Sequence, residues 1–422
     1  MKTSMSIKLK DEPLSKNVRV ITEHNALARS TSVGIWVNTG SRDEEKNQLG
    51  CSHFLEHLLF KGTKTRTSRE ISSMIENRGG HLNAFTDRDL TAYYARVLNR
   101  DQDIATELLC DMLQNSLLKK EDIAMERQVI LEEIKQMWDD PSSLIHELYA
   151  QNIWRGNPIA HPISGTIETI SQMPIETIHE YYEENYSCDL IIVGAGAVDH
   201  ESLVSSLDNF LQKGRGNCAK DRRSPEHFPG QKYIPRNTGQ VQLCISTPGN
   251  EYGSKDSAAQ SIISSYLGLG ASSLLFQEAR EKRGLVYNIY TQNQSFADIG
   301  AFNVFAGTRK KNLGELVEII FRELKSMKKG LDQDTLEKVK HKTIGLYTLS
   351  SESNRQRMHH LGVSTLRRGK PRTVDDIISL LESVTNEDIC RVANNLFKAD
   401  KIAITTLGMS EKESENIRDY LA

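Results

Sequence analysis

The sequence predicts a two-domain protein of the α/β or α+β class, in which each domain is a sandwich of a mixed, mainly antiparallel sheet and covering helices. Three observations lead to this fold class. The chain has 422 residues, which is long for one domain and suits two of about 200 residues each. The order of strand and helix patterns in the first half recurs in the second. A polar stretch separates the two halves.

The recurrence begins with a strand-to-helix unit near the start of each half. TSVGIWVNTGSRDE (31–44) alternates in polarity and is rich in β-formers, and a helical pattern follows at 48–61. GQVQLCISTPGN (239–250) has the same character and precedes the helical SAAQSIISSYLG (257–268). The same local order in both halves indicates a repeated structural unit.

A second recurring unit closes each half. PIETIHEYYEENYSCDLIIVGAG (174–196) predicts a helix followed by a buried strand. TNEDICRVANNLFKADKIAITTLG (385–408) has the same layout, so that Ile178 matches Ile389 and Asp189 matches Asp400. Internal duplication of one α/β unit explains this agreement better than chance.

The stretch between the halves, residues 212–237, is rich in Gly, Pro and charge, as a surface linker is. We therefore expect a first domain at 1–211 and a second domain at 238–422.

Further elements of the first half follow in order. Thr67 and Glu70 have capping-box spacing, and the helix that they begin should end at Gly79 and Gly80. HLNAFTDRDLTAYYARV (81–97) predicts two strands joined at an Asp-Arg-Asp turn. A long helical pattern then ends before Pro141. Strands with helices between them predict a sheet with a helical layer over it.

Composition describes an ordinary globular protein. Hydrophobic residues make up 38% of the chain, charged residues 26%, and the net charge is −3, so nothing favours binding to nucleic acid or to a membrane surface. The six cysteines are far apart, which favours free thiols in a reducing compartment. The N-terminus lacks a targeting pattern, and no apolar run approaches the ~18 residues needed to span a bilayer. These features predict a cytoplasmic protein.

One short stretch, GCSHFLEHLLFKGT (50–63), carries a candidate metal site. On a helix His53 and His57 lie four apart on one face, so their imidazoles can bind a common ion. Glu56 is beside His57, close enough to reach a water molecule at the metal without being a ligand. A catalytic zinc site needs a third protein ligand and one open position.

The third ligand is expected in the helix that ends before Pro141. Glu126 and Glu133 are seven apart, which is two helical turns, and so share a face. Glu132 lies about 100° round from Glu133, and spacing alone excludes it only weakly.

The competing interpretation is an ordinary helix with two surface histidines. In a chain with 12 histidines, the spacing H-x-x-E-H arises by chance in roughly 2% of sequences. The second half serves as a control, because it contains no histidine from 228 to 340. A duplicated fold that keeps these residues in one copy only indicates a site added to the fold.

The motifs at 50–63, 79–97 and 126–137 resemble the pitrilysin/insulinase family of inverzincin metallopeptidases. The resemblance is strongest to the short branch that includes mitochondrial processing peptidase and its bacterial relatives, and it covers essentially the whole chain. It favours Glu133 over Glu132 as the third ligand. The resemblance assigns three roles to five residues. His53, His57 and Glu133 bind one zinc ion per chain, Glu56 is the general base, and Glu126 orients a ligand histidine.

The second half carries a further family signature in GLGASSLLFQEAREKRGLVYNIYT (268–291). By resemblance its Arg280 and Tyr287 complete the active site, since a guanidinium and a phenol can donate hydrogen bonds to a substrate carbonyl. Asn83 and Ala84 lie in the strand that, by resemblance, pairs with the substrate backbone. The chain departs from the family pattern at three positions that bear on substrate preference: Cys51, Ser52 and Leu274.

The sequence therefore predicts a zinc metalloendopeptidase that hydrolyses peptides or unfolded polypeptide segments inside a chamber formed by a homodimer. The alternative is a non-catalytic or partner-dependent subunit of a processing-peptidase-like complex, which the intact zinc motif argues against. A protein that only stores zinc would need a closed four-ligand site, and the sequence offers no fourth ligand.

Overall fold

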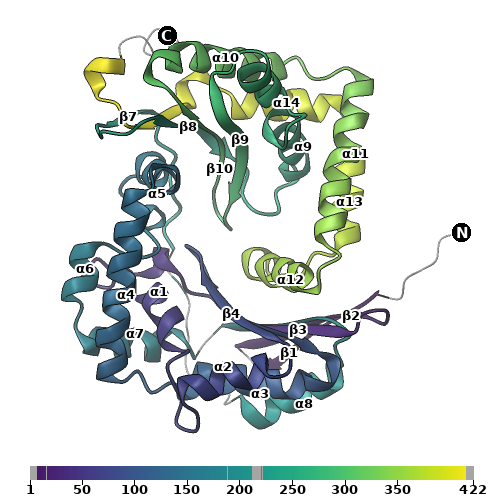
Figure 1. Ribbon diagram of the computed structural model, residues 1–422. Coiled ribbons are helices and arrows are strands. Elements are labelled where there is room, and N and C mark those ends of the chain that lie inside the picture. The colour runs from purple at the N-terminus through teal and green to yellow at the C-terminus, as the bar shows by residue number, and fades with distance from the viewer. Residues whose placement is uncertain (1–6, 16, 188, 212–219, 221, 415–422) are drawn as a thin grey trace, which may run out of the picture. The chain divides into compact units, whose positions relative to one another are not determined.

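The computed structural model describes residues 7–414 apart from 16, 188, 212–219 and 221 (Figure 1). The chain forms two compact units. The first unit comprises Met1–Lys135, His161–Arg222 and Ser350–Arg372. The second unit comprises Gln136–Ala160, Arg223–Leu349 and Thr373–Ala422.

These units differ from the contiguous division at 1–211 and 238–422. Residues 136–160 of the first half belong to the second unit, and residues 350–372 of the second half belong to the first. The expected linker 212–237 lies partly outside the described residues, and its last part forms strand β7 rather than a plain connection.

The first unit is built on a six-stranded sheet with the order β1-β2-β6-β3-β5-β4. Only the contact between β2 and β6 is parallel. The strands are β1 (Ile7–Ser15), β2 (Val18–Asn25), β3 (Ser30–Val37), β4 (His81–Thr86), β5 (Thr91–Leu98) and β6 (Leu190–Gly196).

The second unit is built on a five-stranded sheet with the order β7-β11-β8-β10-β9. Here only β7 and β11 are parallel. The strands are β7 (Gly230–Ile234), β8 (Val241–Gly249), β9 (Val286–Ser295), β10 (Gly300–Thr308) and β11 (Ala403–Leu407). The order repeats that of β2-β6-β3-β5-β4 strand for strand, so the predicted fold of two homologous, mainly antiparallel sheets with helices is confirmed.

Helices cover both sheets (Figure 1). Those of the first unit are α1 (Cys51–Leu58), α2 (Ser68–Glu76), α3 (Gln102–Asn115), most of α4 (Lys120–Asp139), α6 (Ile167–Gln172), α7 (Ile175–Asn185), α8 (His200–Phe210) and α12 (Asn354–Arg368). Those of the second unit are α5 (Pro141–Ile153), α9 (Ser257–Gly268), α10 (Leu313–Met327), α11 (Gln333–Ser350, with its last residue assigned to the first unit), α13 (Val374–Ser383) and α14 (Asn386–Leu396).

Strand β3 shows why the first sheet needs helices on both faces. Val33 and Ile35 point into the main core with α1, α3 and α7, because side chains alternate along a strand. Trp36 points to the opposite face and is fully buried. Helix α12 covers it there, and an ideal Cβ on Gly362 would lie 2.3 Å from the Trp36 ring. Only glycine allows α12 to approach this closely.

Strand β8 repeats the arrangement in the second unit. Leu243 and Ile245 point into a core formed with α9, α10 and α14, whereas Cys244 points into a separate core formed with α5. Each sheet thus receives, on its second face, one helix from the other half of the sequence.

Local signals in the sequence predict the helix ends well. Thr67 and Glu70 form both hydrogen bonds of a capping box at α2, and Gly79 has the left-handed φ of 72° after it. Strands β4 and β5 pair across the Asp-Arg-Asp turn, with Thr86 opposite Thr91.

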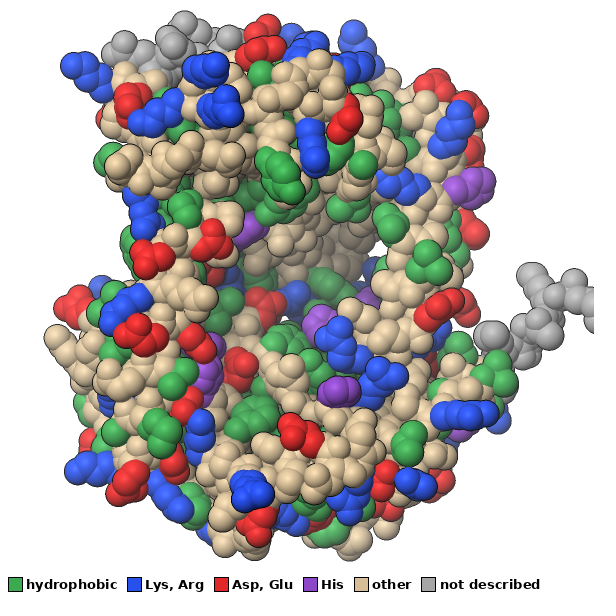
Figure 2. Space-filling view, viewed as in Figure 1, with side chains coloured by type: hydrophobic (Ala, Val, Ile, Leu, Met, Phe, Trp, Pro, Cys, Tyr) green, Lys and Arg blue, Asp and Glu red, His purple; other side chains and the backbone are tan. Residues whose placement is uncertain are grey.

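Neither sign of charge dominates the face of the molecule seen in Figure 2. Figure 2 shows basic and acidic side chains interspersed over the viewed face of each unit. Among the described residues, no helix is both long and apolar enough to cross a membrane. The described cysteines are the free thiols Cys51, Cys110, Cys244 and Cys390, whereas Cys188 and Cys218 lie outside the described residues.

Candidate active site

Helix α1 carries the histidine motif, and a buried carboxylate fixes its first turn. The helix begins after Gly50, whose φ of 96° is left-handed. Both carboxylate oxygens of Glu44 accept hydrogen bonds at the helix start, from the backbone N–H of Gly50 and of Ser52, each at 2.7 Å. Burial raises the pKa of Glu44 to about 8, and the two N–H donors oppose this rise. The start of α1 is therefore held by a side chain from outside the helix.

The structure brings His53, His57 and Glu133 together. The two imidazole rings lie on one face of α1 with their centroids 4.8 Å apart. Glu133 Oε2, from α4, lies 3.9 Å from His53 Nε2 and 3.6 Å from His57 Nε2. All three donor atoms lie within 4.8 Å of one another.

Geometry separates the two adjacent glutamates of α4. Glu132 has a side chain that is 71% exposed and pairs with Lys135 at 2.7 Å. Glu133 instead faces the two histidines. The turn of about 100° between neighbouring helical residues accounts for this difference.

Glu126 contacts His57 on the side of the ring away from Glu133. It is only 3% exposed, and its Oε2 accepts a hydrogen bond of 2.9 Å from Nδ1–H of His57, since a carboxylate can only accept. Its other oxygen pairs with Lys61 Nζ at 2.5 Å. With the proton of His57 fixed on Nδ1, the lone pair of Nε2 faces Glu133 and is free to bind a metal.

The three donors fit a tetrahedral metal ion. Burial, with a smaller contribution from His57, lowers the pKa of His53 to about 4, so its imidazole is neutral at pH 7. Ligand atoms at the usual zinc distances are ~3.3 Å apart in a tetrahedral site. The separations of 3.6 and 3.9 Å from Glu133 to the two imidazoles are somewhat longer than this. Two histidines and one glutamate are a donor set known from catalytic zinc sites, which keep the fourth position open.

Glu56 lies beside these donors on α1 and is held by a strand. Thr86, the last residue of β4, donates a hydrogen bond of 2.6 Å from Oγ1 to Glu56 Oε2. Burial raises the pKa of Glu56, and the Thr86 hydrogen bond works in the opposite direction. The hydroxyl of Thr86 thus fixes Oε2 of Glu56 and so orients the carboxylate beside the three donors.

Asn83 and Ala84 lie on β4, which is the edge strand of the first sheet. The backbone N–H of Ala84 donates to the side chain of Asn83 at 2.8 Å. An edge strand offers backbone groups to an added strand.

Arg280 and Tyr287 lie in the second unit and contact each other. Arg280 belongs to η4 (Phe276–Glu281), a π-helical turn of a kind that is frequent at functional sites. Its guanidinium carbon lies 5.1 Å from the ring centre of Tyr287 and 4.7 Å from that of Phe276. Tyr287 is 76% exposed, so its phenol is accessible.

Comparison with known families places the chain. Residues 19–167 match the insulinase family model, peptidase family M16, and residues 172–343 match the model described as the peptidase M16 inactive domain. The chain belongs to peptidase family M16.

Several M16 relatives are similar over nearly their whole length. An uncharacterized zinc protease of Streptomyces coelicolor is 34% identical over 423 residues, which cover 97% of this chain and 92% of the relative. An uncharacterized zinc protease of Bacillus subtilis is 32% identical over 386 residues, 91% of this chain and 94% of the relative.

Solved structures share the fold at lower identity. A protease from Helicobacter pylori superposes with a TM-score of 0.88 at 22% identity, covering 95% of this chain and 99% of that protein. A structure titled peptidase M16 inactive domain, from Pseudomonas fluorescens, superposes with a TM-score of 0.85 at 18% identity. The match covers 95% of this chain and 98% of that protein.

Sequence analysis of this M16 chain missed three residues that touch the candidate site or its helix. Thr86 and Glu44 have no spacing to α1 that periodicity would reveal, because their contacts depend on the tertiary fold. Lys61 follows the end of α1 at Leu58, so helical periodicity does not predict its ion pair with Glu126 either.

Proposed function

We propose that this M16 peptidase is a zinc metalloendopeptidase that cleaves peptides or unfolded polypeptide segments. The observation that carries the proposal is the meeting of Glu133 with His53 and His57 beside a carboxylate, Glu56, that is not a ligand. The donor set suits one zinc ion per chain. When bound, zinc supplies a Lewis acid that polarises the scissile carbonyl and makes water a better nucleophile at neutral pH.

Glu56 acts as the general base in this proposal. Its carboxylate takes a proton from the attacking water as the oxygen of that water bonds to the carbonyl carbon. The same proton then passes to the leaving nitrogen as the C–N bond breaks. The raised pKa of Glu56 favours the first of these transfers, because a more basic carboxylate takes a proton from water more readily.

Other residues orient the metal ligand His57 or bind the substrate. Glu126 keeps the proton of His57 on Nδ1, which leaves Nε2 as the ligand atom. Tyr287 and Arg280 donate hydrogen bonds to the oxyanion that develops on the carbonyl oxygen. Asn83 and Ala84 pair with the substrate backbone, and the Asn83 amide must leave the Ala84 N–H for this to happen. Backbone pairing predicts broad sequence specificity.

We further propose that the working form is a homodimer that encloses the substrate. In the longer relatives implied by the resemblance, four α/β units form one chamber, whereas this chain has two. The zinc of one subunit would then be served by Arg280 and Tyr287 of a second copy of the chain.

Zinc content and peptide hydrolysis test the proposed chemistry together. We expect the wild type to bind one zinc ion and to cleave a quenched fluorogenic peptide. Glu56→Gln should keep zinc and lose hydrolysis, because it removes the base and leaves the ligands. Loss of zinc in this variant, or turnover close to wild type, would overturn the role of Glu56.

The same measurements distinguish the proposed peptidase from the alternative, a non-catalytic or partner-dependent subunit. A partner-dependent subunit would bind zinc but leave the peptide intact until another chain is added. A chain without zinc and without hydrolysis would contradict the proposal itself.

A further inference from the structure

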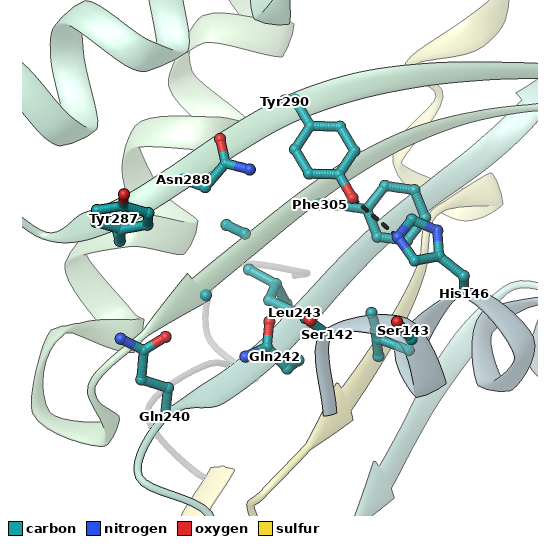
Figure 3. A pocket seen from close by; sticks show the side chains of 13 residues that line it. Ser142, Ser143, His146, Gln240, Gln242, Leu243, Tyr287, Asn288, Tyr290 and Phe305 are labelled. Carbon is teal, nitrogen blue, oxygen red and sulfur yellow. Dashed lines mark hydrogen bonds between the residues drawn. The ribbon is translucent and has the colours of Figure 1, made fainter. Parts of the chain in front are cut away.

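A cavity of about 450 Å³ lies within the second unit, on the face of its sheet that α5 covers (Figure 3). Its walls come from the start of α5 and from strands β8, β9 and β10. Figure 3 shows Tyr287, Asn288 and Tyr290 of β9 on one side, and Gln242 of β8 with Gln240 just before that strand on another. The volume lies in the range of pockets that hold small ligands or parts of a peptide.

Aromatic rings form one wall of the cavity. Phe305 is only 2% exposed, and its ring centre lies 4.1 Å from that of His146 and 5.5 Å from that of Tyr290. His146 Nε2 and the Tyr290 hydroxyl are joined by a hydrogen bond of 2.8 Å, which fixes both rings. A rigid aromatic wall favours a flat apolar group as its partner.

No acidic or basic side chain lines the cavity among the described residues, although charged residues make up 26% of the chain. His146 is neutral at pH 7, because burial lowers the pKa of its imidazole. A charged side chain of a substrate would therefore lose water here without touching a counter-charge, because the neighbouring carboxylate of Asp140 does not line the cavity and is engaged by Ser142 and Ser143. That loss is unfavourable.

The polar groups at the start of α5 present acceptors. The hydroxyls of Ser142 and Ser143 donate to the carboxylate of Asp140 at 2.6 and 2.5 Å, so their oxygen lone pairs remain for a donor. Asp140 also accepts from the backbone N–H of Ser142 at 3.0 Å. This helix start therefore does not offer an anion site. A ligand whose polar tip is an O–H or N–H donor fits it best.

We propose that this cavity is a substrate subsite that takes an uncharged aromatic side chain with a hydrogen-bond donor at its tip, above all tyrosine. The inference rests on the proposed function, because Tyr287 lines the cavity and is also the proposed donor to the oxyanion. A side chain in the cavity therefore belongs to a residue near the bond that is cleaved. The subsite adds side-chain selectivity to the backbone pairing expected along β4.

A position-scanning set of quenched peptides tests the subsite in the wild-type, zinc-loaded protein. Each position in turn carries Tyr, Phe, Lys or Glu in an otherwise constant Ala/Ser/Gly peptide. We expect one position at which kcat/KM is about tenfold higher for Tyr than for Lys or Glu. Equal rates for Tyr, Lys and Glu at every position would overturn the proposal.

A charge placed in the cavity should redirect this preference. Gln242→Glu is nearly isosteric and adds a carboxylate, so the rate for Lys relative to Tyr should rise about tenfold at the same position. Asn288→Asp, on the exposed side of β9, should act in the same direction and serves as a second variant if Gln242→Glu folds poorly. The matched control is Gln292→Glu, which adds the same charge on β9 outside the cavity and should leave the ratio unchanged. A ratio that moves equally in the control, or in neither cavity variant, would contradict the subsite.

Peptide binding, measured without hydrolysis, tests the subsite independently of the proposed function. The same peptides, labelled with a fluorophore, are titrated against the full chain carrying Glu56→Gln and followed by anisotropy. Tighter binding of the Tyr peptide, reversed toward Lys by Gln242→Glu, supports the subsite even if the wild type hydrolyses nothing and the proposed function fails. Hydrolysis by the wild type with no Tyr preference in either assay overturns the subsite and leaves the proposed function standing.

Discussion

The hydroxyl of Thr86 donates a hydrogen bond of 2.6 Å to the carboxylate of Glu56, and this contact joins the end of edge strand β4 to helix α1. A direct hydrogen bond therefore links the strand proposed to pair with the substrate to the proposed general base. A peptide that binds along β4 meets a base whose orientation is set by the same strand. Hydrogen bonds to a carboxylate are stronger than those between neutral groups, so the orientation is firm.

Removing this hydroxyl should reduce catalysis without removing the metal. Thr86→Val keeps the shape and strand preference of the residue but loses the donor, and we expect kcat to fall about tenfold, equivalent to ~1.4 kcal/mol in the barrier. Because the hydrogen bond lowers the pKa of Glu56, its loss should also move the acidic limb of the pH–rate profile to higher pH.

Thr86→Ser is the matched control, since it retains the hydroxyl and should keep both kcat and the pH profile close to wild type. Zinc content should be unchanged in both variants. A Thr86→Val enzyme with an unaltered pH profile would show that the hydroxyl does not position Glu56.

Two neighbouring glutamates of α4 offer a sharp test of the metal ligands. Glu133→Gln should weaken zinc binding by at least about 100-fold, because even partners behind the ligands change metal affinity 10–100-fold. Glu132→Gln should leave zinc affinity near wild type, since its side chain is largely exposed and pairs with Lys135. Competition with a chromophoric chelator measures both affinities, and the opposite order would move the third ligand by one residue.

Much of this site was accessible from the sequence because its signals are local. Periodicity and turn chemistry over a few residues predict three of its parts. These are the helix that holds His53 and His57, the helix cap at Thr67, and the two strands joined by the Asp-Arg-Asp turn. The duplication was visible because both halves keep the same order of apolar segments.

The remaining features depend on contacts that no local pattern encodes. The apolar faces of α5 and α12 predict burial but do not say which sheet buries them, so the exchange of these helices between the units was missed. The link from Glu44 to the start of α1 and that from Thr86 to Glu56 connect residues that are close only after folding. Helical spacing alone left both Glu132 and Glu133 open as the third ligand, and the family resemblance favoured Glu133. The position of α4 against α1 brings Glu133, and not Glu132, to the two histidines.

His227 should make the stability of the protein fall in weak acid. Its Nε2–H donates to the carbonyl of Lys401 at 2.9 Å, and its Nδ1 is buried with no hydrogen-bond partner among the described residues. Burial lowers its pKa from 6.5 to about 4. Between these two values the unfolded chain binds the proton more readily than the folded one, so stability is complete above pH 6.5 and is lost as the pH falls toward 4.

The loss should be on the order of 2 kcal/mol, allowing for partial exposure of the ring. His227→Gln keeps an N–H donor and does not titrate, so its unfolding free energy should vary less with pH over this window. Urea denaturation of both proteins at several pH values between 7 and 4 measures the difference. Parallel curves for the two would show that His227 is not responsible.

The proposed sharing of the active site between two subunits can be decided by mixing two damaged chains. Glu56→Gln lacks the base and Tyr287→Phe lacks the proposed oxyanion donor, so each alone should be nearly inactive. If Tyr287 serves the zinc site of the other subunit, a mixed dimer contains one doubly damaged site and one intact site. Random pairing makes half of the dimers mixed, and activity should recover to about a quarter of wild type when the sites act independently. If both residues act within one chain, every site carries a lesion and mixing restores nothing. A lack of recovery, with subunit exchange demonstrated by differently tagged chains, would therefore reject the shared site while leaving the zinc chemistry of each chain intact.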